Sequence, residues 1–394
     1  MEYRALGTTG LSVSALCLGV AFRGSGFVWS SSPDQGRTED DCVRTIERAV
    51  ELGCNFIDCA NFYGRGTSEE ILGRTVKQLG GRDQLIITSK VGSAMGEGVG
   101  EQGLSRRHIM HEVEMTLRRL QMDYVDVYFL HQPDPHTPLD DTLRAMHDIV
   151  QQGKARYIGV SNHVAAEIVE LLWTADRRGL IAPSVLQYQY SLVTRRYAEE
   201  DILPLCDRFG LGLMTFSPLA IGLLTGQVRS GQPIPEDSHW YQNPQTEAVL
   251  EATEPIIAAC VAVAEELGRT PAQVALAWLL AKPAVSAPII GPELPEHVDE
   301  LFGAVGWQLP PEAIETLDSA SEPTEEHSPS EDAEQCQKAA EALKNKMLGL
   351  EHFLQDKKDH KERCPKLEWE QPSLEEYRKD PKSYLPETCT NTNI

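Results

Sequence analysis

The sequence lacks the features that mark membrane, secreted and metal-binding proteins. No apolar run approaches the ~20 residues that a membrane-spanning helix needs, and the opening MEYRALGTTG has no basic-then-apolar layout of a secretory signal. The nine cysteines form no CxxC pair and no Cys/His spacing, which argues against a disulfide framework and a zinc site. We therefore expect a cytoplasmic protein without a metal centre.

Positive charge is also scarce. Lys and Arg number 36 against 59 Asp and Glu, and the formal net charge is −23. Nucleic acid and anionic lipid are bound through Lys and Arg, so we expect neither nucleic acid nor a membrane as a partner.

Short apolar strands alternate with helical segments from about residue 11 to residue 291. This is the pattern of repeated βα units around a parallel sheet. Eight such runs are present: SALCLG, NFIDCA, LIITSK, DVYFLH, YIGVSN, SVLQ, LMTFS and APIIG. The pattern predicts an α/β protein with a (β/α)₈ TIM barrel.

Three of the intervening segments place apolar residues at steps of three and four. They predict amphipathic helices over residues 39–52, 68–79 and 105–120. Ser68, Ser105 and Thr270 stand at expected helix starts, where a hydroxyl can cap the first turn.

The composition changes after the predicted barrel, which we place at residues 1–321. Residues 322–332 form a Pro/Ser/Glu-rich acidic linker, and residues 333–394 form an extension whose role the sequence does not indicate. Within the extension, residues 333–358 predict an amphipathic helix with an apolar stripe. A single helix cannot bury that stripe, so the extension either packs on the barrel or binds a protein partner.

Polar residues end most of the predicted strands, at the end of a TIM barrel where active sites form. They are Asp58, Lys90, His131, Ser161, Asn162, Gln187 and Ser217. We expect them to converge on one mouth. An unpaired charge there is costly, so Asp58 and Lys90 should touch each other.

Tyr63 follows Asp58 on a glycine-containing loop that can turn its phenol over the barrel mouth. A phenol has an ordinary pKa of about 10, and we expect the Lys90 ammonium to lower that pKa. The alternative is an aromatic anchor packed on the rim. His131 could bond a substrate carbonyl or share the tyrosine proton, with a buried core histidine as its alternative.

Seven segments taken together resemble the signature segments of aldo-keto reductases, in the family order over residues 1–321. They are LGTTGLSVSALCLG, FIDCANFYGRGTSEEILG, IITSKVG, LHQPDP, GKARYIGVSN, TFSPLAIGLLTG and PIIG. GLLTG and LHQPDP are most similar to the branch of bacterial sugar and aldehyde reductases and potassium-channel beta subunits. The resemblance implies a catalytic tetrad of Asp58, Tyr63, Lys90 and His131, with hydride passing from a reduced nicotinamide to a carbonyl carbon.

The resemblance also implies a set of cofactor-binding residues. Ser161, Asn162 and Gln187 would hold the nicotinamide carboxamide, Phe216 would stack on its ring, Ser217, Leu219, Gly222 and Leu224 would follow the pyrophosphate, and Gly291, Glu293, His297 and Glu300 would meet the adenosine.

The family resemblance favours NADP as the cofactor. Glu293, however, stands where many relatives have an Arg, and a glutamate repels a 2′-phosphate but can accept hydrogen bonds from the ribose diol of NAD. Alternatively, Glu293 points to solvent and a Lys or Arg from elsewhere contacts the phosphate.

The sequence therefore predicts an NAD(P)H-dependent reductase of aldehydes, ketones or sugar-like carbonyls, with Tyr63 as general acid and a small-molecule carbonyl as its partner. The alternative is a nicotinamide-binding regulatory or sensor subunit with little turnover. Substrate choice should reside in residues 22–38, 92–103 and 227–250. Trp29 and Trp240 in these loops either line the pocket or hold the loops down.

Overall fold

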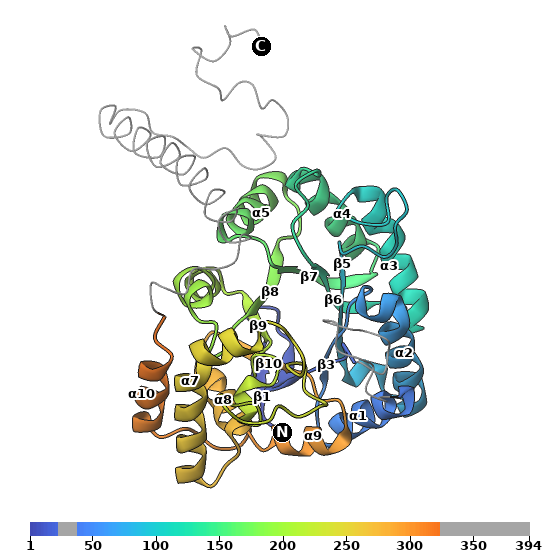
Figure 1. Cartoon of the computed structure of the whole chain (residues 1–394). Coiled ribbons are helices and arrows are strands. Elements are labelled where there is room, and N and C mark those ends of the chain that lie inside the picture. The colour runs from blue at the N-terminus through green and yellow to red at the C-terminus, as the bar shows by residue number, and fades with distance from the viewer. Residues whose placement is uncertain (23–37, 324–394) are drawn as a thin grey trace, which may run out of the picture. The chain divides into compact units, whose positions relative to one another are not determined.

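The computed structural model describes residues 1–22 and 38–323 of the chain (Figure 1). The chain divides into two units, Met1–Pro329 and Ser330–Ile394, and the described residues all belong to the first. Residues 324–332 of the predicted linker and the predicted amphipathic helix over residues 333–358 lie outside the described part, as does Trp29. The predicted domain boundaries at residues 321 and 332 therefore stay predictions.

Eight parallel strands close into a barrel, which confirms the predicted (β/α)₈ fold. In chain order they are β3 (Cys17–Gly19), β4 (Phe56–Asp58), β5 (Ile86–Val91), β6 (Val125–Leu130), β7 (Ala155–Ser161), β8 (Pro183–Gln189), β9 (Gly212–Phe216) and β10 (Val285–Ile290). Neighbours in sequence pair with each other, and β10 pairs with β3 to close the ring. Every residue of β3, β4, β5, β6 and β10 is buried, as expected for strands covered on both faces.

Helices surround the barrel and follow the strands in alternation (Figure 1). They are α1 (Glu39–Glu51), α2 (Thr67–Leu79), α3 (Arg106–Leu120), α4 (Leu139–Gln151), α5 (Ala165–Arg178), α6 (Leu203–Phe209), α7 (Thr246–Leu267), α8 (Pro271–Leu280), α9 (Pro295–Phe302) and α10 (Pro311–Ala320). The three predicted amphipathic helices correspond to α1, α2 and α3.

Two of the three predicted helix caps are confirmed. Ser105 accepts a hydrogen bond from His108 N, and Thr270 forms a capping box with Gln273. The prediction for Ser68 is wrong. Helix α2 begins one residue earlier, after Gly66, so Ser68 lies buried in the first turn.

An antiparallel hairpin precedes the barrel and was not predicted. It pairs β1 (Tyr3–Ala5) with β2 (Ser12–Ser14). Leu6 and Val13 are fully buried and pack with residues that begin barrel strands, including Phe56 and Ile86. The hairpin thus covers the amino-terminal end of the barrel and leaves the carboxyl ends of the strands for a site.

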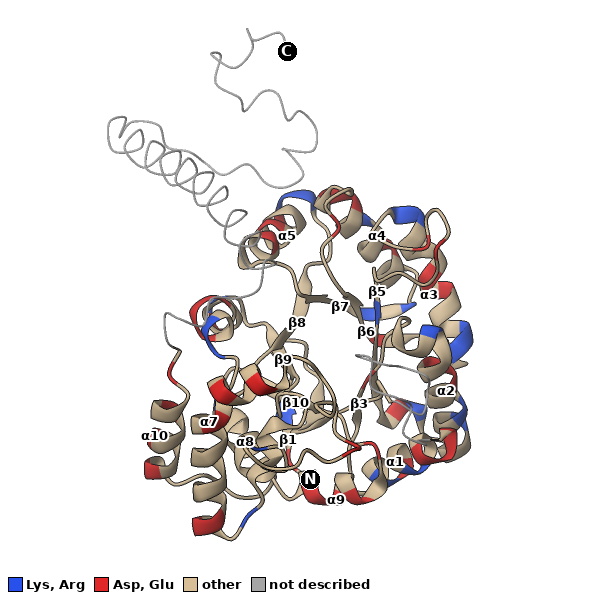
Figure 2. Ribbon diagram, in the orientation of Figure 1, with Lys and Arg blue, Asp and Glu red and all other residues tan. Residues whose placement is uncertain are grey.

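The outer helices carry much of the charge, and Figure 2 shows acidic residues on α7, α9 and α10. These three helices contain no Lys or Arg. Within residues 1–22 and 38–323, no helix is long and apolar enough to cross a membrane. The same ranges hold no cluster of three or more His, Cys, Asp or Glu suited to a metal ion.

Candidate active site

A cavity of about 490 Å³ opens at the carboxyl ends of the barrel strands, a volume typical of small-molecule sites. Of the predicted site residues it is lined by Asp58, Tyr63, His131, Ser161, Asn162, Gln187, Phe216, Ser217, Leu219, Gly222, Gly291, Glu293, His297 and Glu300. Lys90 lies fully buried behind this lining. The predicted convergence at one mouth is confirmed.

Lys90 is bonded to both of its expected neighbours. Its Nζ lies 2.6 Å from Asp58 Oδ2 and 3.1 Å from Tyr63 Oη, and it also donates to Cys59 O at 2.8 Å. The side chains of Lys90 and Asp58 are 0% and 2% exposed. An ammonium has three donors, and here all three are used inside the protein.

Asp58 is held in place by more than the ion pair. Its other carboxylate oxygen, Oδ1, accepts from Thr88 Oγ1 at 2.6 Å and from Gln187 Nε2 at 2.8 Å. A buried carboxylate is tolerated when it is paired and hydrogen-bonded in this way. The amide of Gln187 is therefore oriented by Asp58.

A strained turn brings the phenol of Tyr63 to Lys90. The turn Tyr63–Gly66 has three successive residues with positive φ: Gly64 at 57°, Arg65 at 51° and Gly66 at 99°. The left-handed region costs a residue with a side chain roughly 1–2 kcal/mol, so the surroundings must hold Arg65 there. Tyr63, at the start of this turn, is only 8% exposed.

The pKa values of the pair depart from the sequence prediction. Burial is the largest influence on Tyr63 and raises its pKa to about 12, although the Lys90 ammonium acts in the opposite direction. Lys90 thus lowers the pKa of Tyr63 as predicted, but the sequence analysis did not foresee that burial outweighs this effect and makes the net shift upward. Burial alone would lower the pKa of Lys90, but the contacts with Asp58 and Tyr63 outweigh it and raise that pKa. At neutral pH both groups keep their protons.

His131 lies beside Tyr63 as a neutral imidazole. The two rings meet edge to face with centroids 6.1 Å apart, and His131 Nδ1 lies 3.2 Å from Ser93 Oγ. Burial, and then the charge of Lys90, lower the pKa of His131 to about 3. Because His131 lines the cavity, it is not a core histidine.

The polar residues at the carboxyl end of β7 are fixed by hydrogen bonds of their own. Ser161 Oγ donates to Gln187 O at 2.9 Å, and Asn162 Nδ2 donates to His131 O at 2.8 Å. Asn162 also adopts a left-handed φ of 60°. The site therefore presents these groups in fixed orientations.

The loop after β9 forms another part of the wall. Ser217, Ala220 and Ile221 have φ values of 50°, 49° and 55°. Leu224 follows in the short turn Leu223–Thr225 and does not reach the cavity. Its side chain is fully buried in the core and its amide donates to Leu219 O, because the turn directs this residue inward.

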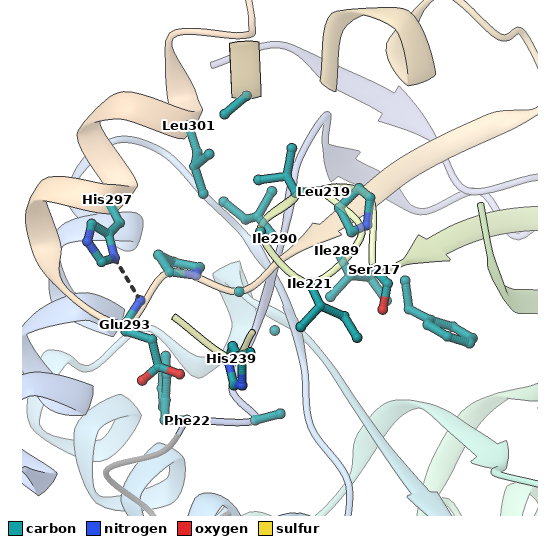
Figure 3. Close-up of a pocket in the computed structure, with 18 of the residues that line it drawn as sticks. Phe22, Ser217, Leu219, Ile221, His239, Ile289, Ile290, Glu293, His297 and Leu301 are labelled. Carbon is teal, nitrogen blue, oxygen red and sulfur yellow. Dashed lines mark hydrogen bonds between the residues drawn. The ribbon is translucent and has the colours of Figure 1, made fainter. Parts of the chain in front are cut away.

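The far end of the cavity is acidic. Figure 3 shows Glu293 and His297 at this end, with the Glu293 amide donating to His297 Nδ1 at 3.3 Å. Glu300 also lines it. Among the lining residues that the structure describes, none is a Lys or an Arg.

Several lining residues were not predicted as site residues, among them Phe22, Gln189, Asp237, Ser238 and His239. The sequence could have predicted Gln189, because it stands two positions after Gln187 and residues two positions apart in a strand point to the same face. The other four lie in the segments 22–38 and 227–250, where the sequence analysis placed substrate choice without naming individual residues.

Trp240 is the one predicted loop tryptophan within the described part. Its Nε1 donates to Ile221 O at 2.9 Å, and its ring packs against the core. It is absent from the cavity lining. Trp240 therefore holds its loop against the wall of the cavity, as one of the two sequence interpretations expected.

Comparison with known proteins identifies the class to which this fold and site belong. The model of the Aldo/keto reductase family matches residues 19–322. The chain belongs to this family.

Three relatives with the same kind of name extend the comparison. A protein of Schizosaccharomyces pombe named "Putative voltage-gated potassium channel subunit beta" is 36% identical over 332 residues, which cover 81% of this chain and 92% of that protein. Proteins named "Probable voltage-gated potassium channel subunit beta" are 36% identical in Arabidopsis thaliana (77% of this chain, 91% of that protein) and 35% identical in Oryza sativa subsp. japonica (81% and 96%).

Proposed function

We propose that this chain is an NAD(P)H-dependent reductase of aldehydes, ketones or sugar-like carbonyl compounds, with Tyr63 as its proton donor. One observation carries the proposal. Tyr63 Oη lies on the cavity wall 3.1 Å from Lys90 Nζ, and the same ammonium is paired with Asp58 at 2.6 Å. An ammonium in this position stabilises the phenolate that remains when the phenol gives up its proton.

The raised pKa of Tyr63 is compatible with this role. With a pKa of about 12, the phenol is fully protonated at neutral pH and holds the proton to be donated. An alkoxide is about as basic as hydroxide, and the conjugate acid of hydroxide, water, has a pKa of about 15.7. Transfer of the proton from the Tyr63 phenol to the alkoxide is therefore favourable. A neutral His131 can donate an N–H to the carbonyl oxygen and place it near Tyr63.

The residues around the cavity fit a nicotinamide cofactor. When bound, the reduced nicotinamide would supply the hydride for the carbonyl carbon. Asn162 and Gln187 offer amide groups to its carboxamide, and each is already oriented by one hydrogen bond within the protein. Phe216, which ends β9 on the lining, offers a ring face for stacking.

Within this function we propose a preference for NADH over NADPH. The adenosine end of the cavity is lined by Glu293 and Glu300, and no described lining residue is a Lys or Arg that could pair with a 2′-phosphate. A carboxylate beside that phosphate would repel it, whereas it could accept hydrogen bonds from a ribose diol. Inhibition by AMP should therefore be stronger than inhibition by 2′-phospho-AMP.

The test is the turnover of Tyr63→Phe on a panel of carbonyl substrates with NADH and NADPH. General acid catalysis contributes about 10²- to 10⁴-fold, so kcat should fall by that order while the Kd of the nucleotide is unchanged. Tyr157→Phe is a matched control, because its hydroxyl donates to Thr9 O at 2.6 Å, away from the cavity lining. Equal turnover in Tyr63→Phe and wild type would refute the assignment.

A second candidate is a regulatory or sensor subunit that binds a nicotinamide and turns over little. Its support is the printed names of the three relatives, all potassium channel beta subunits. Mixed with a carbonyl compound as hydride acceptor, such a subunit would oxidise one equivalent of bound NADH and then stop. Stopped-flow absorbance followed by a steady-state assay distinguishes this candidate from a reductase.

A further inference from the structure

A second buried charge cluster lies outside the barrel wall, between β5 and the helices α2 and α3. Arg119 Nε lies 2.6 Å from Glu69 Oε2, and its Nη2 lies 3.4 Å from Glu112 Oε2. The side chains of Glu69, Glu112 and Arg119 are 0%, 7% and 13% exposed. None of the three lines the cavity.

Each carboxylate of the cluster is also bonded to the chain segment that carries a proposed catalytic residue. Glu69 Oε1 accepts from Ser89 Oγ at 2.6 Å, and Ser89 directly precedes Lys90. Glu112 Oε2 accepts from Asn61 Nδ2 at 2.9 Å, and Asn61 stands two residues before Tyr63. Arg119 therefore links the two segments through a continuous path of side-chain contacts.

The strained turn that carries Tyr63 also rests on Arg119 directly. A Cβ added at Gly66 would lie 2.6 Å from Arg119 Cδ and 2.9 Å from its Nε. Only a glycine at φ 99° allows the turn to approach the arginine this closely. The positive φ values of the turn need such a support, because the conformation is unfavourable on its own.

Stability alone is a weak reason for burying these charges. The desolvation of buried ions offsets much of their attraction, and apolar side chains of similar volume often stabilise a protein as well or better. What an ionic cluster adds is defined geometry, since an arginine fork bonds two carboxylates in fixed directions. At this place, the geometry that it defines is that of the Tyr63 turn relative to β5.

We propose that Arg119, through Glu69 and Glu112, is a positioning residue that sets the distance between Tyr63 and Lys90. Ser89 and Asn61 connect the cluster to these two residues. The inference rests on the proposed function for its effect on turnover, and it concerns residues that touch neither substrate nor cofactor.

The first test compares Arg119→Lys with a matched control, Arg82→Lys. A lysine keeps the charge but cannot bond both carboxylates in the arginine geometry. A displacement of about 1 Å in a reacting group costs on the order of 10²-fold, so kcat of Arg119→Lys should fall about 10- to 100-fold, with the KM of the carbonyl and the Kd of NADH unchanged.

The control alters a similar ion pair near the other end of β5. Arg82 Nη2 lies 2.8 Å from Asp126 Oδ2, with side chains 19% and 10% exposed, and Asp126 accepts from Ile87 N in β5. Arg82→Lys should keep the wild-type kcat even if it lowers stability. Equal losses of kcat in both variants would overturn the proposal, because they would indicate a general effect of destabilisation.

A second readout does not depend on turnover. Hydrogen exchange of the amides of residues 60–70, measured by mass spectrometry, should become at least about tenfold faster in Arg119→Lys and stay unchanged in Arg82→Lys. If wild type reduces no carbonyl, the proposed function fails while this measurement still decides the positioning role. Unchanged exchange together with unchanged kcat overturns the inference.

Milder variants cover the case in which Arg119→Lys does not fold. Ser89→Ala removes the hydroxyl that bonds Glu69, and Ser89→Thr keeps a hydroxyl in a residue type suited to a strand. We expect Ser89→Ala to lower kcat and to accelerate exchange in residues 60–70, and Ser89→Thr to restore both. Wild-type values of both quantities in Ser89→Ala would refute the linkage.

Discussion

The neutral state of His131 makes the stability of the protein sensitive to acid in a defined way. Burial and the neighbouring Lys90 lower the pKa of His131 from its ordinary value of 6.5 to about 3. The unfolded chain therefore binds a proton at His131 in a pH range where the folded chain does not. We propose to remove this difference with His131→Gln, a side chain that stays neutral at every pH.

The sign and size follow from proton linkage. Stability is unaffected by this group above pH 6.5 and is lost as pH falls from 6.5 towards 3, because only the unfolded state gains the proton. One pH unit corresponds to about 1.4 kcal/mol, so between pH 7 and pH 5 the group removes about 2 kcal/mol from the free energy of unfolding. This value of about 2 kcal/mol requires only that the pKa of His131 in the folded protein lies well below 5.

The assay is urea unfolding of wild type and His131→Gln at pH 7, 6 and 5, with His111→Gln as a control on an exposed histidine. The variant should lose about 2 kcal/mol less than wild type between pH 7 and pH 5. Whatever His131→Gln costs at pH 7 cancels in this comparison. Parallel curves for wild type and His131→Gln would mean that folding does not lower the pKa of His131, and the proposed imidazole that stays neutral below pH 6.5 would then be wrong.

Three further predictions concern the ion pair, the cofactor and the extension. Asp58→Asn leaves the Lys90 ammonium buried without a carboxylate and should lower the free energy of unfolding, measured with denaturant, by about 3–5 kcal/mol. The double variant Asp58→Asn with Lys90→Met should recover part of this loss. Strictly additive losses from the two single variants would contradict the pairing. Glu293→Arg should shift the ratio of kcat/KM for NADPH over NADH upward by about tenfold or more, equivalent to about 1.4 kcal/mol, and an unchanged ratio would mean that Glu293 does not face the adenosine. Removal of residues 322–394 should leave turnover intact, because every proposed site residue precedes them. A lowered Tm of the truncated protein would favour packing of the extension on the barrel, whereas an unchanged Tm would favour binding of the extension to a separate protein partner.

The barrel was predictable because its strands carry a strong local signal. Runs such as the one around Asp58 are short, apolar and end in a polar residue, and their alternation with helical segments leaves few other arrangements. The amino-terminal hairpin was not predictable in the same way. Each of its strands has three residues, too few for a period, and its role depends on Leu6 and Val13 meeting barrel residues far away in sequence.

The location of the site residues at the strand ends was predictable from the sequence, but the pKa values of these residues were not. The contact between Asp58 and Lys90 followed from the cost of leaving either charge unpaired in a closed space. The pKa of Tyr63 depends instead on how completely the phenol is buried, and no local pattern reports that quantity. The cluster around Arg119 was not predicted for a related reason, because Glu69, which pairs with Arg119, lies 50 positions away in the chain.

Burial and neighbouring charges together set the protonation states of Lys90, Tyr63 and His131 at neutral pH. Burial by itself would remove the charge from Lys90, and the contacts with Asp58 and Tyr63 reverse that effect. Burial also keeps the proton on Tyr63 and keeps His131 neutral, and for His131 the Lys90 charge acts in the same direction. The ion pair thus places a permanent cation beside the phenol that would lose its proton, and the charge of Lys90 adds to burial in keeping the imidazole neutral. A carbonyl oxygen that gains negative charge would then meet a phenol with its proton, a neutral N–H donor and a single buried positive charge behind them.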